Sequence, residues 1–254
     1  MRMLMVADTY RPRVNGVVTS IDTFSAEYRK MGHEVMVVAP EYPEGQKDVK
    51  DASAEKYVIR LPSHHIWFDP EDRWASLSNK KSKKIIEEKI INGGFDVMHT
   101  HVSGSLGFAA VKWAKKAGCP VIHTYHTLFE QYVHYIKIVP KKIGVWIARY
   151  VSKIYCDKMD LVITPSTQMK DTLATYNVKK SVPVIVNPTG IKIDIFKNFS
   201  RADFRKKHNI AESTTLFLFM GRVGFEKNIP FLFDVLKKIL VSRPDTKLIV
   251  AGKG

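Results

Sequence analysis

Short apolar runs alternate with longer amphipathic stretches along most of the chain. The runs are almost continuously apolar, as in parallel strands covered on both faces, and they predict strands at residues 3–7, 35–39, 57–61, 96–99, 121–124 and 161–164. The stretches between them predict helices over residues 17–31, 73–91, 105–117 and 140–155. Gly32 and Gly118 follow two of these helices, where glycine favours helix termination. This alternation implies right-handed crossovers, so we expect an α/β fold with a doubly wound parallel sheet.

The alternation is interrupted at residues 187–200, and this segment, which begins Asn187-Pro188-Thr189-Gly190, favours a crossing between domains. Beyond it the pattern restarts, with strands at 215–220 and 247–251 around a helix at 229–241. We therefore expect two domains, residues 1–190 and residues 191–254. The helix at 229–241 is apolar on nearly every side, which predicts burial on several faces. One βαβ unit cannot provide that burial, so we expect the second domain to be cut short.

The composition is that of a folded protein. The 254 residues are 45% hydrophobic and 26% charged, a balance that excludes a disordered chain. The two cysteines, Cys119 and Cys156, are too few for a disulfide framework, which favours the cytoplasm. No apolar run approaches the ~20 residues that span a bilayer.

The chain is strongly basic, and the excess is uneven. Residues 1–127 hold 18 basic and 15 acidic side chains, a net charge of +3, whereas residues 128–254 hold 22 and 10, a net charge of +12. A basic half favours an anionic partner, which could be a nucleic acid, a phosphate-bearing substrate or an acidic membrane surface. A nucleic-acid-binding protein would show a known binding motif or aromatic residues among the basic ones on an exposed sheet. The sequence shows neither, so we expect no nucleic-acid partner.

The loop after the first predicted strand, residues 8–16, opens into a helix. Gly16 lies close to the expected N-terminus of that helix, where backbone N–H groups and the helix dipole favour an anion. The alternative is that Gly16 only provides the backbone flexibility that the turn requires. The dinucleotide fingerprint G-x-G-x-x-G is absent, which argues against a nicotinamide enzyme.

Histidines follow two of the middle strands. His99 and His101 would share one face of a strand and could pair on a metal ion, but no carboxylate or cysteine lies at a supporting spacing. We therefore expect no metal site. His126, beyond the strand at 121–124, is the best candidate for chemistry, because a histidine there can bond a sugar hydroxyl or phosphate, or share developing charge. The alternative is that these histidines only satisfy polar groups at strand ends.

The restarted unit places Gly221-Arg222-Val223-Gly224-Phe225-Glu226-Lys227-Asn228 directly after its first strand. Arg222 and Lys227 flank a turn that leads into a helix, so both cations can converge on one anion. A planar guanidinium together with a point charge suits a diphosphate. The alternative is an ordinary basic loop.

These three motifs together resemble a known family. The loop at residues 8–16, the strand end His123-Thr124-Tyr125-His126-Thr127 and the segment 221–228 match, in order and spacing, the motifs of family 4 retaining glycosyltransferases, which have the GT-B fold. The continuation into Glu130-Gln131-Tyr132-Val133-His134-Tyr135 looks most like the branch that glucosylates diacylglycerol. The resemblance implies a complete Rossmann-like N-terminal domain that binds the acceptor, followed by the first βαβ unit of a second such domain that binds the donor.

The resemblance also implies roles for single residues. The donor would be a nucleotide-diphosphate sugar, UDP-glucose by the branch, and the acceptor a membrane lipid such as diacylglycerol. Gly16 would contact the donor diphosphate through its backbone, and Arg222 and Lys227 would neutralise the leaving group. His126 would contact the donor sugar and stabilise the oxocarbenium-like transition state. Tyr10 and Asn15 would contact the acceptor, and no metal, haem, flavin or nicotinamide is implied.

One family element is missing. The family grips the donor sugar and ribose with a Glu-x7-Glu element farther along the second domain, and the sequence ends before that element could occur. We therefore expect an incomplete enzyme that is inactive alone. A non-catalytic module that holds a lipid or a partner chain is the alternative.

Basic and apolar residues are interleaved over residues 137–158. Six lysines or arginines stand there against Asp157 alone, together with Trp146 and an apolar stripe. A helix of this kind is typical of an interfacial membrane segment. We expect it to attach the protein to the inner face of the cell membrane. The alternative is that the stripe packs on the sheet and the lysines are solvated.

Overall fold

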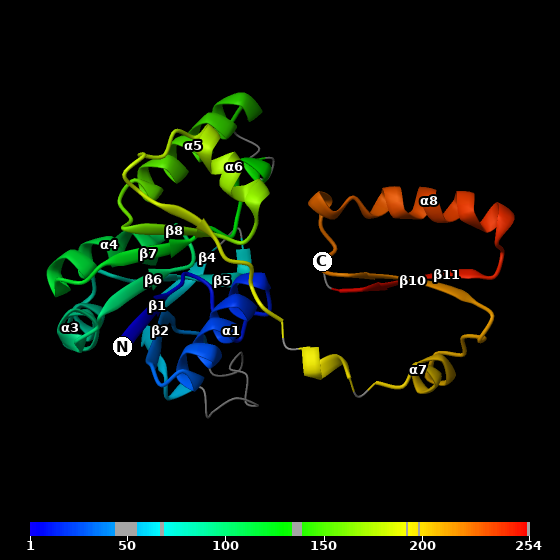
Figure 1. The fold of residues 1–254 in the computed structure, drawn as a ribbon, viewed down its shortest axis with the longest axis horizontal. Helices are drawn as coiled ribbons and strands as arrows, with labels where there is room; N and C mark the ends of the chain where they lie inside the picture. Colours follow the sequence, from blue (N-terminus) through cyan, green and yellow to red (C-terminus); the bar gives the residue numbers. More distant parts are fainter. Residues whose placement is uncertain (44–54, 67–68, 134–138, 192, 198, 253–254) are drawn as a thin grey trace. The chain divides into compact units, whose positions relative to one another are not determined.

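The structure is a computed structural model that describes residues 1–43, 55–66, 69–133, 139–191, 193–197 and 199–252 (Figure 1). The chain divides into two compact units, Met1–Lys192 and Ile193–Gly254. Each unit is considered by itself. Within the described residues, no helix is both long enough and apolar enough to cross a membrane.

The first unit is built on one parallel sheet. In the described part of the chain this sheet has seven strands in the order β3-β2-β1-β6-β7-β8-β9. Their bounds are β1 (Arg2–Val6), β2 (Glu34–Pro40), β3 (Val58–Leu61), β6 (Val97–Thr100), β7 (Val121–Thr124), β8 (Leu161–Thr164) and β9 (Val184–Val186). The order runs outward in both directions from β1 and β6, so the predicted doubly wound α/β fold is confirmed.

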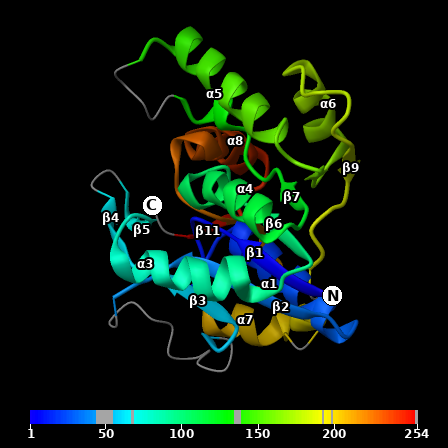
Figure 2. The ribbon, with the colours of Figure 1, turned by 90° about the vertical axis from the view of Figure 1, so that its left-hand side faces the viewer.

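Helices cover both faces of this sheet (Figures 1 and 2). Helix α1 (Gly16–Lys30) packs on one face, where Val18 and Ile21 join Met3 and Met5 of β1. The opposite face takes Leu4 and Val6, because successive side chains of a strand alternate. That face is covered by α3 (Lys80–Ile85) with its π-helical continuation (Ile86–Ile90), α4 (Ser105–Ala117), α5 (Lys141–Cys156) and α6 (Thr167–Thr175).

The predicted strands are found to within about one residue at each end, but the helix predicted over 73–91 is wrong in its first part. Residues 73–75 belong to β5 (Asp69–Ala75), which pairs antiparallel with β4 (Ser63–Ile66). The helix begins only at Lys80, because the Asn79 side chain caps it by accepting the Ser82 N–H at 2.7 Å. Sequence reasoning also missed β4, α6 and β9.

The second unit contains α7 (Arg201–Lys207), β10 (Thr215–Met220), a short 3₁₀ turn (Phe225–Lys227), α8 (Ile229–Ser242) and β11 (Thr246–Ala251). Strands β10 and β11 are parallel neighbours, as the pattern predicted. A Cβ on Gly252 would lie 1.8 Å from the Gly221 carbonyl oxygen, so only glycine fits where the carboxyl ends of the two strands approach.

Helix α8 is less buried in this unit than its apolar sequence predicts. Phe231 is 59% exposed and Val241 is 88% exposed. On the paired strands Leu218 and Met220 are also exposed. The described residues of the unit therefore leave apolar surface uncovered on both the helix and the strands.

Candidate functional site

The candidate site lies at the carboxyl ends of β1, β6 and β7. The direction of winding changes between β1 and β6, and ligands of open parallel sheets bind at such a point. Strand β1 leads into the loop at residues 8–16, β6 supplies His99 and is followed by His101, and β7 leads to His126. The strand register pairs Met5 with His99 and Thr100 with His123. Two of the three sequence motifs therefore meet at one edge of the sheet.

Asp8 ties the start of the loop to α4. Its Oδ1 accepts the Leu106 N–H at 2.9 Å and the Ser105 hydroxyl at 2.8 Å. It thereby replaces the side-chain cap that Gly104, the residue before α4, cannot provide. A Cβ on Gly104 would lie 2.6 Å from this carboxylate, so the position requires glycine. Burial raises the pKa of Asp8, although these hydrogen bonds oppose the shift.

Asp22 of α1 holds the middle of the loop. It accepts the Tyr10 hydroxyl at 2.7 Å, and Arg11 binds it through Nε at 2.9 Å and Nη2 at 2.8 Å. Tyr10 is only 4% exposed, and burial together with the Asp22 charge raises the pKa of its hydroxyl. In this structure Tyr10, which the sequence suggested as an acceptor contact, lies inside the network of the loop.

Asn15 and Gly16 form the end of the loop and the start of α1. The Asn15 side chain accepts the Val18 N–H at 2.9 Å and caps the helix. Gly16 is exposed, and no other atom lies within 4 Å of where its Cβ would be. The first turn of α1 holds no acidic side chain. With the Val18 N–H taken by the Asn15 cap, the N–H groups of Gly16 and Val17 are the ones that face an anion from solvent.

Three histidines, His99, His101 and His126, contact one another at the ends of β6 and β7, and His123 lies apart from them. His101 Nε2 lies 3.1 Å from the sulfur of Met5, and His101 Nδ1 lies 3.0 Å from His126 Nε2. His99 Nε2 lies 2.7 Å from the Thr124 hydroxyl oxygen. On the other face of the sheet, His123 Nδ1 lies 2.9 Å from the hydroxyl oxygen of Thr100. His126 is thus the outermost member of a chain of contacts that begins on β1.

Burial keeps these histidines neutral. It lowers the pKa of His99 and of His123 to about 3, with a further effect of the nearby His126. It lowers the pKa of His126 to about 4, and the pKa of His101 well below its ordinary value. At neutral pH His126 therefore acts as an uncharged hydrogen-bonding group and brings no positive charge of its own.

The contacts also determine which nitrogen of His126 holds the proton. A thioether sulfur only accepts, so His101 Nε2–H donates to Met5 and His101 Nδ1 is left as an acceptor. His126 Nε2–H then donates to His101 Nδ1. His126 Nδ1 keeps its lone pair and can accept a hydrogen bond from a ligand hydroxyl.

The histidines do not form a metal site. The rings of His99 and His101 are tilted by 32° with centroids 4.2 Å apart, and their Nε2 atoms face different partners, the Thr124 hydroxyl and the Met5 sulfur. Among the residues that the structure describes, no three His, Cys, Asp or Glu side chains are placed to hold a metal ion.

The third motif lies in the second unit, directly after β10. Arg222 and Lys227 are both exposed, and the Arg222 guanidinium pairs with Glu226 at 2.9 Å. A Cβ on Gly224 would lie 2.6 Å from the Glu226 carboxylate, so this glycine leaves room for the pair. Helix α8 begins immediately afterwards, with Pro230 in its first turn. Sequence reasoning did not identify Glu226, which balances one of the two cations.

Helix α5 covers most of the basic segment predicted to meet a membrane; residues 137 and 138 lie outside the described residues. Its inward face buries Ser152, Tyr155 and Cys156. The apolar stripe is exposed, which shows that the alternative of a stripe packed on the sheet is wrong. Trp146 is 63% exposed, and its ring stacks on that of Tyr150 with centroids 5.3 Å apart. The other exposed members are Ile143, Ile147 and Val151.

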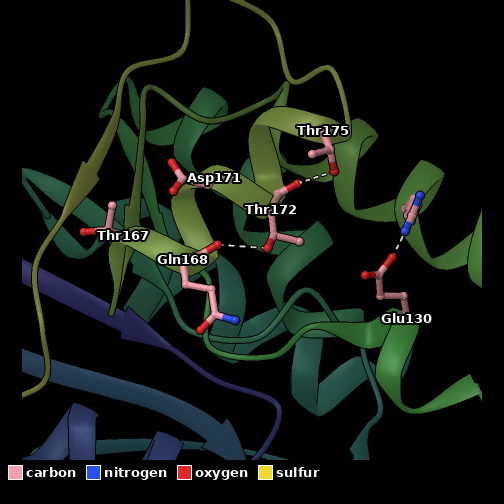
Figure 3. Close-up of a pocket in the computed structure, with 7 residues that line it drawn as sticks. Glu130, Thr167, Gln168, Asp171, Thr172 and Thr175 are labelled. Atoms are coloured by element: carbon pink, nitrogen blue, oxygen red, sulfur yellow. Dashed lines mark hydrogen bonds and ion pairs between the residues drawn. The ribbon is translucent and has the colours of Figure 1, made fainter.

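A polar groove runs between α6 and the segment that follows β7 (Figure 3). Its volume is about 520 Å³. One wall is the ion pair between Glu130 and Arg149 of α5, and the other is a face of α6. The α6 side chains along this wall are Thr167, Gln168, Asp171, Thr172 and Thr175. Sequence reasoning missed this groove because it did not predict α6.

Two family profiles match the chain. Residues 14–195 match the profile described as Glycosyltransferase Family 4, and residues 200–254 match that of glycosyl transferases group 1. The chain belongs to glycosyltransferase family 4. The family predicted from the three motifs is thereby confirmed.

Curated members of the family resemble the whole of this chain. An alpha-monoglucosyldiacylglycerol synthase of Streptococcus pneumoniae is 33% identical to it, and one of Acholeplasma laidlawii is 26% identical. A GDP-mannose-dependent alpha-mannosyltransferase of Mycolicibacterium smegmatis is 25% identical. All three alignments cover 100% of this chain, which spans 56%, 64% and 64% of the relatives in that order.

Solved structures confirm the GT-B fold expected for the family. The Anabaena protein HepE in complex with UDP superposes with a TM-score of 0.69 at 14% identity, over 100% of this chain and 61% of that one. Sucrose-phosphate synthase of Thermosynechococcus elongatus gives a TM-score of 0.68 at 19% identity, over 99% of this chain and 62% of that one. At such low identity these likenesses support the fold alone.

Proposed function

We propose that this chain is part of a retaining hexosyltransferase that moves glucose from UDP-glucose to a membrane lipid such as diacylglycerol. The observation that carries the proposal is the meeting of an open helix N-terminus at Gly16 with a neutral, oriented His126 at one sheet edge. The resemblance to two glucosyldiacylglycerol synthases supports the choice of donor sugar and acceptor.

Each site residue receives a role under this proposal. The first turn of α1 at Gly16 binds the donor diphosphate through backbone N–H groups. We assign Arg222 and Lys227 of the second unit to neutralising the leaving diphosphate as the glycosidic bond breaks. The bond to the acceptor oxygen forms on the face that the diphosphate leaves, and the leaving phosphate oxygen takes the acceptor proton. Configuration at the sugar carbon is then retained.

His126 and the loop act on the sugar and the acceptor. His126 Nδ1 accepts a hydrogen bond from a hydroxyl of the donor sugar and holds the ring as positive charge develops on it. Asn15, which is only partly buried, lines the acceptor side of the loop, and Tyr10 keeps the loop in place through Asp22. No metal or organic cofactor takes part in this scheme.

A transfer assay tests the proposal. The chain alone, with UDP-glucose and diacylglycerol vesicles, is expected to give negligible transfer, because the donor-gripping element is absent from it. We therefore also propose a chimera in which residues 1–254 are joined to the part of the Streptococcus pneumoniae synthase that they do not span. This chimera is expected to form glucosyldiacylglycerol, and His126→Ala is expected to slow it about 100-fold.

The control for His126→Ala is His64→Ala, which changes an exposed histidine on β4. It is expected to leave the rate unchanged. A folded chimera that transfers no sugar, tested beside the active parent synthase, would count against the proposed function. Robust transfer by the 254-residue chain alone would refute its proposed incompleteness.

We further propose that α5 attaches the protein to the cytoplasmic face of the cell membrane. The exposed stripe around Trp146 and Tyr150 would enter the interface, while the exposed Lys142 beside it would meet an anionic headgroup. Binding to anionic phosphatidylglycerol vesicles, weak binding to phosphatidylcholine vesicles and loss of binding in high salt are expected. Trp146→Ala with Tyr150→Ala is expected to abolish binding, whereas Trp74→Ala, a half-exposed tryptophan on β5, is not. Equal binding to both vesicles would contradict the proposal.

A further inference from the structure

The groove between α6 and the Glu130–Arg149 pair, called here the α6 groove, has the size of a ligand site. Its volume is about 520 Å³ and it is shallow and open to solvent, so it can hold one side of a headgroup-sized ligand. Both walls follow the carboxyl ends of strands, since Glu130 comes after β7 and α6 comes directly after β8. The groove therefore opens at the edge of the sheet where ligands of this fold class bind.

The chemistry of the lining excludes several ligand classes. Arg149 is already neutralised by Glu130, and Asp171 adds a negative charge, so a phosphate would meet net repulsion. An apolar ligand would cover the Asp171 carboxylate without offering it a hydrogen bond. The two carboxylates lack the third ligand that a metal site requires within the described residues. A neutral, polar ligand remains.

The direction of the hydrogen bonds favours a ligand rich in hydroxyl groups. The Thr172 hydroxyl donates to the Gln168 carbonyl at 2.8 Å, and the Thr175 hydroxyl donates to the Thr172 carbonyl at 2.6 Å (Figure 3). Their protons are used within the helix, so these oxygens offer lone pairs to the groove. Together with the Asp171 carboxylate they accept from O–H groups, while the Gln168 amide and Arg149 supply donors. Vicinal hydroxyls of a sugar or polyol match this set.

The groove also adjoins the exposed stripe of α5. Residues three or four apart on a helix are neighbours, so Arg149 in the groove wall lies beside Trp146 on the stripe. At about 100° per residue, the stripe and the basic side chains occupy adjacent sectors, and the stripe faces away from the buried Ser152. A polar head in the groove would thus have an apolar surface next to it for its tail.

We infer that the α6 groove binds the neutral, hydroxyl-rich headgroup of a membrane lipid while its chains lie against the stripe of α5. The inference rests on the proposed membrane function for the choice of a lipid over a free sugar. It assigns Gln168 and Asp171 as headgroup contacts and Trp146 as a contact of the apolar part. The groove would hold a glycolipid more firmly than diacylglycerol, because diacylglycerol offers one free hydroxyl.

Binding of n-octyl β-D-glucoside to the 254-residue chain tests the inference without any donor. Amide chemical shifts of α6 are followed as the detergent is added below its micelle concentration. We expect saturable binding that weakens about tenfold in Asp171→Asn with Gln168→Ala. Lys170→Ala, an exposed change on α6 away from the groove, is the matched control and is expected to bind normally. Far-ultraviolet circular dichroism confirms that each variant is folded.

Two further probes separate the sources of the headgroup. Glucose, which lacks a tail, is expected to bind the groove more weakly than octyl glucoside, and equal affinity would overturn the assignment to a lipid. Sodium octyl sulfate has the same tail with an anionic head and is expected not to shift α6; stronger binding of it there would overturn the polyol assignment. Unchanged binding of octyl glucoside by the double variant would overturn the site itself.

These outcomes are independent of catalysis. If the double variant loses octyl glucoside binding while the chimera described above is inactive, the inference about the α6 groove is supported and the proposed function is refuted. If the chimera is active and octyl glucoside does not bind at α6, the proposed function is supported and the inference about the α6 groove is refuted.

Discussion

Acidification is predicted to unfold the first unit through its buried histidines. His99 and His123 titrate at about 3 and His126 at about 4 in the folded chain, whereas a histidine in the unfolded chain titrates near 6.5. The unfolded state therefore binds more protons than the folded state at any pH between these values. The contribution of these groups to stability is fully present above pH 6.5 and is lost progressively as the pH falls below it.

The magnitude follows from the size of the shifts. For each histidine that stays neutral in the folded chain, the free energy of unfolding falls by ~1.4 kcal/mol for every pH unit below the pKa of the unfolded chain. At pH ~4.5, two units below, His99, His123 and His126 each lower the free energy of unfolding by roughly 2–3 kcal/mol. The sum, about 8 kcal/mol, is comparable to the whole stability of a typical domain, ~5–15 kcal/mol.

Urea unfolding followed by tryptophan fluorescence measures this loss. All four tryptophans lie in the first unit, and Trp113 is buried against the sheet, so the signal reports that unit. The free energy of unfolding is expected to fall by several kcal/mol between pH ~7.5 and ~4.5, with about three protons taken up on unfolding by His99, His123 and His126 together. His64→Gln, an exposed histidine, is the control and is expected to give the same curve. A change below about 2 kcal/mol over this range would refute the assignment of neutral, buried histidines.

Three other predictions concern the positioning contacts. Asp8→Ala removes the cap of α4 and is expected to lower the free energy of unfolding by about 1–2 kcal/mol in urea titrations; no measurable change would contradict the capping role. Asp22→Asn weakens the hold on the loop at residues 8–16, which is expected to raise amide hydrogen exchange there and not in β1; unchanged exchange would show that Asp22 is dispensable. Met5→Leu removes the sulfur that accepts from His101, so nitrogen-15 spectra are expected to show a mixture of His126 tautomers. Met3→Leu, on the same face of the sheet, is the control and is expected to keep a single His126 tautomer. A single tautomer in both variants would disprove the role of the sulfur.

The parallel sheet was predictable because each of its main strands is a continuous apolar run. Residues 73–75 were misread as helix because β4, the antiparallel strand that pairs with them, was itself not predicted. The short strand β9 at the sheet edge has three residues, and α6 begins in a polar segment that offers little periodicity. The groove could not be predicted without that helix.

Within the candidate site, sequence reasoning identified Gly16 and His126 because both follow strands. Their supporting partners were not predictable in the same way. Asp22 reaches the loop from α1, and His101 receives contacts from both β1 and the end of β7. Such partners are defined by side-chain direction across neighbouring elements, which no local pattern records.

The contact of Met5 with His101 has an evolutionary consequence. A residue at position 5 that cannot accept a hydrogen bond leaves the buried His101 Nε2–H without a partner, so Met5 is constrained as long as position 101 is histidine. Positions 5 and 101 are therefore expected to vary together among family members. Relatives that have lost the histidine at position 101 would need another way to orient the residue at position 126, and their sugar specificity would be free to diverge.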